Sequence, residues 1–145
     1  MNGRVIHTPP GGPPPGPGPS KEIYAAMGEE NIFRMMSDFY KELEQSAIRR
    51  LFPPDMEAAS RKSALFFVTL VGGPPLYLEK YGPPRMRARH LPFVIDEPAR
   101  EVWLGCFDRI LEHAADYRFP AEHLPGFRKF LRDFSAWMVN SAAGT

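Results

Sequence analysis

Residues 32–43 read IFRMMSDFYKEL and carry the clearest helical pattern of the chain. Their apolar members recur mostly at steps of three and four, at Ile32, Phe33, Met36, Phe39, Tyr40 and Leu43. This spacing gathers the apolar side chains on one stripe of an α-helix and leaves charged residues on the other side. The pattern predicts an amphipathic helix whose aromatic face is buried.

The flanking sequence predicts further helices. A helix is expected between a cap at Ser20 and a break at Gly28, and another from Ala58 to Val71, before the Gly-Gly-Pro-Pro run of residues 72–75. Asp96 is a candidate N-cap for a helix that carries Val102, Trp103, Cys106, Phe107, Ile110 and Leu111. The last predicted helix carries Phe127, Phe130, Leu131, Phe134, Trp137 and Met138. Residues 76–95 are less regular, although a short helix fits residues 86–90. Because no segment alternates for long with a period of two, the predicted fold is all-α.

Composition excludes several classes of protein. The 145 residues include 18 Lys and Arg against 17 Asp and Glu, so the formal net charge of +1 favours neither nucleic acid nor an acidic membrane as partner. A single cysteine, Cys106, excludes an internal disulfide framework. No apolar run approaches the roughly 20 residues of a membrane span. These features lead us to expect a cytoplasmic protein.

The first twenty residues differ in composition from the rest. Seven prolines lie within residues 9–19, and five glycines lie within residues 3–18. Proline donates no backbone hydrogen bond, so this stretch cannot complete a helix or a sheet. We therefore predict a disordered Pro/Gly-rich tail over residues 1–20 and one domain over residues 21–145. The tail could be a ligand for a partner domain, but an inert solubilising leader is the preferred interpretation.

Aromatic residues and one histidine raise the question of a cofactor. Eleven Phe, five Tyr and two Trp either fill the core or line a pocket for a flat apolar group, and composition alone favours core packing. His90 lies between arginines and an apolar stretch, and no second ligand stands at a zinc-like spacing. A single histidine ligand is the pattern of haem. Taken alone, however, such a histidine is more often packed or solvated.

Several short motifs occur together in one order along the chain. They are Phe39-Tyr40, Leu51-Phe52-Pro53, Gly72-Gly73-Pro74 with Tyr77, Arg87-Ala88-Arg89-His90-Leu91-Pro92-Phe93-Val94-Ile95, and Ala99 through Cys106 with Trp103-Leu104. The combination resembles the truncated haemoglobin family over roughly residues 22–140, and within it the second group, which has a tryptophan in the haem pocket. The resemblance implies a two-over-two helical sandwich around haem b (iron protoporphyrin IX).

The resemblance also implies a role for particular residues. His90 would be the proximal ligand of the iron, and the distal side would be formed by Tyr40, Trp103, Phe52, Ala59 and Ser63. The ring and its propionates would contact Lys62, Phe66, Phe67, Tyr77, Met86, Arg87, Arg89, Phe93, Ile95 and Met138. Ser63 departs from the family pattern, which often has Leu or Gln there, and this predicts a roomier or wetter pocket. Cys106 could be a thiolate ligand of haem, but a small buried apolar residue is the preferred interpretation.

The function expected from this resemblance is reversible binding of O₂ and other diatomic ligands. The hydroxyl of Tyr40 can donate a hydrogen bond and the indole of Trp103 can only donate, which favours O₂ over neutral carbon monoxide. The alternative is a haem redox enzyme, such as a nitric oxide dioxygenase or a peroxidase-like protein. Such an enzyme would need an external reductase, because no Gly-x-Gly-x-x-Gly motif is present. A second alternative is a helical interaction module without haem. The sequence is compatible with a monomer or a homodimer.

Overall fold

The computed structural model describes residues 5–14, 16 and 18–142, and in this part of the chain it contains helices and no strand. The seven α-helices are α1 (Ile23–Met27), α2 (Glu29–Glu44), α3 (Met56–Leu70), α4 (Leu76–Tyr81), α5 (Met86–His90), α6 (Glu97–Leu111) and α7 (Leu124–Met138). Short 3₁₀ helices lie at Arg49–Leu51, Ala114–Tyr117 and Ala121–His123. The prediction of an all-α fold is confirmed. None of the described helices is long and apolar enough to cross a membrane.

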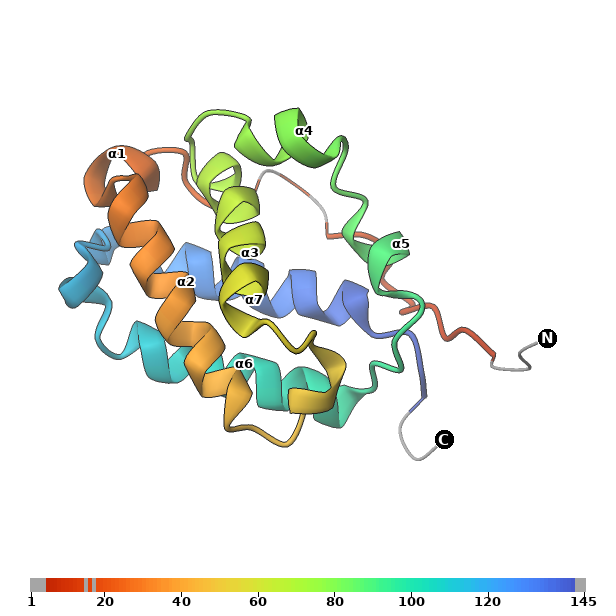
Figure 1. Ribbon diagram of the computed structural model, residues 1–145. Helices are drawn as coiled ribbons and strands as arrows, with labels where there is room; N and C mark the ends of the chain where they lie inside the picture. Colours follow the sequence, from red (N-terminus) through yellow and green to blue (C-terminus); the bar gives the residue numbers. More distant parts are fainter. Residues whose placement is uncertain (1–4, 15, 17, 143–145) are drawn as a thin grey trace.

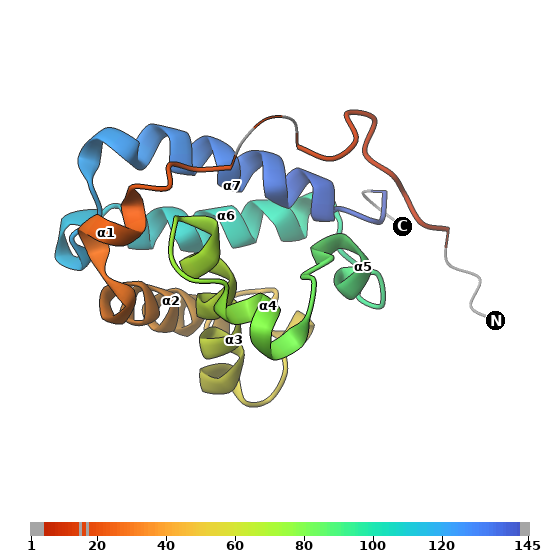
Figure 2. The ribbon, with the colours of Figure 1, turned by 90° about the horizontal axis from the view of Figure 1, so that it is seen from above.

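The four long helices form two layers. Helices α2 and α3 lie side by side in Figure 1, and the turned view in Figure 2 shows them below the pair α6 and α7. The short helices α4 and α5 lie at one side of this sandwich, and the chain between them joins the two layers (Figure 2). The arrangement is the two-over-two sandwich that the resemblance to truncated haemoglobins implies.

One phenylalanine from each long helix meets at the centre of the sandwich. The ring centroids of Phe39 on α2 and Phe107 on α6 are 4.2 Å apart. Phe67 on α3 and Phe127 on α7 each lie 5.8 Å from Phe107. All four side chains are buried. Burial of such a side chain contributes roughly 1.5–3 kcal/mol to the stability of the fold, so this cluster is a main packing contact between the two layers.

The Gly-Gly-Pro motif has a packing reason. Gly72 follows α3 with a φ of 107°, and a Cβ atom there would lie 1.9 Å from the carbonyl oxygen of Lys21. A Cβ at Gly73 would lie 2.6 Å from the ring of Tyr24. The two glycines therefore allow α1 to approach the end of α3, where the Tyr24 N–H donates to the Val71 carbonyl at 2.9 Å.

The observed helix ends refine the sequence predictions. The Asp96 side chain accepts a hydrogen bond from the Ala99 N–H at 2.9 Å, so the predicted cap of α6 is confirmed. The predicted cap at Ser20 is wrong for α1, which begins at Ile23. Ser20 instead accepts from the Glu22 N–H at 3.1 Å, in the turn before the helix. The helix expected over residues 86–90 is present, but α4 lies in a stretch that the sequence showed as irregular.

The described part of the N-terminal segment has no helix or strand and runs alongside α7 (Figure 2). The His7 N–H donates to the Asn140 carbonyl at 2.8 Å. The disorder that the sequence predicts for residues 1–20 stays a prediction, and residues 1–4, 15 and 17 lie outside the described residues.

Candidate functional site

A cavity of about 340 Å³ lies among α3, α5, α6 and α7. Its volume is in the range of pockets that hold small molecules and cofactors. Of the site residues predicted from the sequence, it is lined by Tyr40, Phe52, Ala59, Lys62, Ser63, Phe66, Phe67, Tyr77, Met86, Arg89, His90, Phe93, Ile95, Trp103 and Met138. The remaining lining residues are Ile48, Leu51, Pro53, Arg100, Phe134 and Ser135. Most of the wall is therefore apolar and aromatic, with a few polar groups.

His90 is the last residue of α5 and presents one free ring nitrogen. Its Nδ1 lies 2.6 Å from the Met86 carbonyl oxygen. A carbonyl can only accept, so Nδ1 carries the proton and Nε2 keeps its lone pair. Burial lowers the pKa of His90, and the bond to Met86 opposes this only in part, so the imidazole is neutral at pH 7. No described residue bonds to Nε2, which leaves it able to bind a metal.

The described residues contain no group of three or more His, Cys, Asp or Glu side chains that could hold a metal ion. The metal ligand that the described residues offer at this cavity is a single neutral imidazole. A metal held there needs its other ligands from a non-protein group, as in haem.

Two hydroxyl groups meet in the cavity. Burial raises the pKa of Tyr40, and the neighbouring hydroxyl of Ser63 lowers it in part. The phenol therefore stays protonated at neutral pH and can donate. The ring of Tyr40 packs edge-on against Phe52, with centroids 5.6 Å apart, which limits its movement.

Trp103 supplies a further donor from α6. Its ring packs edge-on against Phe39 and Phe107, with centroid separations of 5.5 and 5.6 Å. No described residue accepts a hydrogen bond from the indole N–H. This is an unused donor at the wall of a largely apolar cavity.

The cations predicted near His90 separate in the structure. Lys62 and Arg89 line the cavity, the first with its ammonium 4.6 Å from the centroid of the Tyr81 ring. Arg87 does not line it. Its guanidinium donates to the carbonyl oxygens of Trp137, Val139 and His7 instead, at 2.6, 2.8 and 2.8 Å. Arg87 is therefore not among the residues that line this cavity, and its contact with the cofactor stays a prediction.

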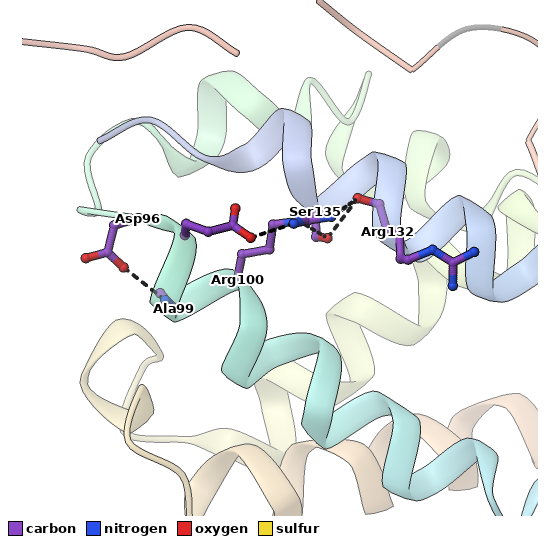
Figure 3. A network of polar contacts seen from close by, with 6 residues as sticks. Asp96, Ala99, Arg100, Arg132 and Ser135 are labelled. Carbon is purple, nitrogen blue, oxygen red and sulfur yellow. Dashed lines mark hydrogen bonds and ion pairs between the residues drawn. The ribbon is translucent and has the colours of Figure 1, made fainter. Parts of the chain in front are cut away.

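Arg100 is a cavity residue that the sequence interpretation missed. Figure 3 shows it extending from α6 to α7, where its Nε donates to Ser135 Oγ at 3.0 Å. The same guanidinium donates to the Arg132 carbonyl at 2.9 Å and pairs with Glu97 at 2.7 Å. Helical spacing was the available signal, since Arg100 precedes Trp103 by three residues and Ser135 precedes Met138 by three.

Cys106 lies outside the cavity lining. Its side chain is fully buried, and its Sγ lies 3.4 Å from a guanidinium nitrogen of Arg109. Burial raises the pKa of the thiol, so Cys106 is neutral at pH 7. The interpretation of Cys106 as a small buried residue agrees with this placement.

Known proteins share this sequence and architecture. Residues 22–140 match the family model described as bacterial-like globin. The group 2 truncated hemoglobin YjbI of Bacillus subtilis is 37% identical over 91 residues, which are 62% of this chain and 69% of that protein. The crystal structure of phosphate-bound Hell's gate globin IV superposes with a TM-score of 0.82 at 38% identity, over 90% of this chain and 81% of that one. A truncated oxygen-avid haemoglobin from Bacillus subtilis gives a TM-score of 0.74 at 33% identity, over 81% of this chain and 98% of that one. The chain belongs to the bacterial-like globin family and, within it, to the group II truncated haemoglobins, a membership that implies a haem cofactor.

Proposed function

We propose that this protein binds O₂ reversibly, together with other diatomic ligands, at a haem b held by His90. The observation that carries the proposal is that three residues with suitable chemistry line one cavity. His90, whose neutral imidazole keeps a free Nε2, lines this cavity together with Tyr40 and Trp103, which carry a hydroxyl and an indole N–H.

The residues present fit a haem. The wall is built largely from rings and aliphatic side chains, which suit a flat apolar macrocycle. Lys62 and Arg89 bring cations to the cavity wall, and bonds between cations and carboxylates are charge-assisted. The Nε and Nη2 of Arg89 already donate to the carbonyls of Pro84, Tyr81 and Pro83, so Arg89 would pair with a carboxylate through its remaining donors. The Met86 carbonyl fixes the tautomer and direction of the His90 ring, which is the usual outer-shell support of a ligating histidine.

Bound haem iron would supply a coordination position for a diatomic ligand and make O₂ a strong hydrogen-bond acceptor there. The chain supplies the donors. A hydrogen bond to a charged acceptor contributes about 1.5–3 kcal/mol, so bonds from Tyr40 and Trp103 would together slow O₂ release by on the order of 10²–10⁴. The oxygen-avid relative from Bacillus subtilis supports this expectation.

A peroxidase-like function is less supported by the cavity. Among its described lining residues His90 is the single histidine, and its Nδ1 is already committed to Met86. A distal histidine–arginine pair for acid–base chemistry is therefore not assembled from these residues. Nitric oxide turnover would still need electrons from an external reductase.

The free, buried thiol of Cys106 agrees with a reducing, cytoplasmic setting.

Haem titration of the purified protein tests the proposal. We expect a strong absorption band near the blue edge of the visible spectrum that shifts on reduction and again on addition of carbon monoxide. His90→Ala should lose most of its haem retention, and free imidazole should restore part of the spectrum. His113→Ala is the matched control, since His113 is exposed and outside the cavity. A protein that stays colourless with excess haem, or equal retention in both variants, would reject the proposal.

A further inference from the structure

Asn140 is a buried polar residue that contacts the turn after His90. It lies two residues beyond the end of α7, and its side chain is fully buried. Its Oδ1 accepts from the Ile95 N–H at 3.0 Å, and its Nδ2 donates to the carbonyl oxygens of Phe93 and His90 at 2.9 and 3.2 Å. Because an N–H only donates and a carbonyl only accepts, these partners determine the orientation of the amide, and the Ser141 hydroxyl also donates to Oδ1 at 3.3 Å.

The turn after His90 is also closed by its own backbone, because the Phe93 N–H donates to the His90 carbonyl at 3.0 Å. Residues 91–95 contain Pro92 and form no helix, and the side chains of Phe93 and Val94 are 44% and 45% exposed. Backbone bonds from Asn140 and Ser141 to the Ile95 carbonyl, at 2.9 and 3.0 Å, attach only the far end of the turn to α7. The Asn140 amide is a side-chain group that connects the end of α7 to the carbonyl of His90 itself.

Arg87 makes a second attachment before His90. Its guanidinium donates to the carbonyls of Trp137 and Val139 and lies 4.6 Å from the centroid of the Trp137 ring. A cation suits the carboxyl end of a helix, where carbonyl groups lack intrahelical partners. Helix α5 is therefore tied to the end of α7 on both sides of its final histidine.

We propose that Asn140 is a positioning residue for His90, which it holds through the backbone while Met86 holds the ring. This inference rests on the proposed function of His90 as an axial ligand. A ring fixed at Nδ1 alone can still tilt when its backbone moves, so the direction of Nε2 depends on both attachments. The observable consequence lies in the strength and uniformity of the iron–histidine bond.

Asn140→Asp is the sharpest perturbation, because it keeps the size of the side chain and the acceptor for Ile95. It removes both donors and turns a carboxylate oxygen toward the carbonyls of His90 and Phe93. We expect the iron–histidine stretching band of the ferrous protein, measured by resonance Raman spectroscopy, to shift and broaden. Transfer of haem to an excess of apomyoglobin should become roughly tenfold faster.

Asn31→Asp is the matched control. It loses one amide donor to a main-chain carbonyl, that of Met27 at 2.9 Å, and Asn31 lies outside the cavity lining. This variant should leave the band and the transfer rate unchanged. An unchanged band in Asn140→Asp, or an equal change in both variants, would overturn the inference.

Hydrogen exchange of the native protein covers the case in which Asn140→Asp does not fold. The Ile95 amide should be protected to the same degree as amides near the end of α7, because it is bonded to a buried side chain. Exchange of this amide at the rate of an exposed turn would overturn the inference. A wild-type protein with no iron–histidine band would instead refute the proposed function, and the two failures are therefore distinguishable.

Discussion

Replacing Trp103 by Phe tests the donor role of the indole with little disturbance of packing. The substitution removes the N–H and part of the ring, but it retains an aromatic side chain against Phe39 and Phe107, whose centroids lie 5.5 and 5.6 Å away. No described residue accepts from this N–H, so its loss leaves no protein group unpaired. The expected change is therefore confined to the ligand.

One lost hydrogen bond to a charged acceptor corresponds to about 1.5–3 kcal/mol, which is roughly a 10- to 150-fold faster release of O₂. Stopped-flow displacement of O₂ measures this rate directly. Release of carbon monoxide, a neutral ligand, should change much less, and the ratio of the two rates separates hydrogen bonding from a steric effect.

Trp137→Phe provides the matched control, because it is the same substitution at a tryptophan outside the cavity lining and it keeps an aromatic ring beside the Arg87 guanidinium. It should leave the release of O₂ unaltered. If Trp103→Phe released O₂ at the wild-type rate, or if O₂ and carbon monoxide were affected equally, the indole would not be the donor that the geometry indicates.

Three further predictions follow from the described contacts. Tyr40→Phe should speed O₂ release by roughly tenfold or more in the same stopped-flow assay, and an unchanged rate would remove the phenol from the site. Gly72→Ala should lower the free energy of unfolding by about 2 kcal/mol or more in urea, because its Cβ would lie 1.9 Å from a backbone oxygen and its φ is 107°. The pKa of Tyr117 is raised by burial and by its 2.7 Å hydrogen bond to Asp38, so the folded protein holds this proton after the unfolded chain has released it. Stability should therefore fall as pH rises above about 10, and Tyr117→Phe should show a shallower fall in pH-dependent denaturation; parallel curves would contradict this assignment.

The long helices could be predicted from the sequence because each repeats its apolar pattern over several turns. The stripe from Ile32 to Leu43 is an example, and it lies wholly within α2. Helix α4 has only six residues, which is too short for a helical period to separate from chance. Its position depends on contacts with α3 that no local pattern shows.

The arginines near His90 show a different limit. On a short helix Arg87 lies closer in angle to His90 than Arg89 does, since residues three apart share a face. Spacing would therefore favour Arg87 as the cavity residue, but the structure places Arg89 there. The carbonyls of Trp137 and Val139 hold Arg87, and they lie fifty residues or more along the chain. The acceptors that Arg87 finds lie far from it in the sequence, so the residues around His90 alone could not predict its placement.

The structure indicates a role for Ser63 that could not be predicted from its residue type alone. Its hydroxyl neighbours the phenol of Tyr40 in the cavity wall, and a hydroxyl can donate and accept at the same time. If Ser63 donates to the phenol oxygen, the phenol proton is free to turn toward the cavity, and donation to the ligand is strengthened by the bond behind it. Trp103 has no such intermediate group. The two donors therefore differ in their surroundings: both rings are held by packing, but the phenol also has a neighbouring hydroxyl that can rotate. Rotation of Ser63 between donating and accepting would alter the contribution of Tyr40 while that of Trp103 stays constant.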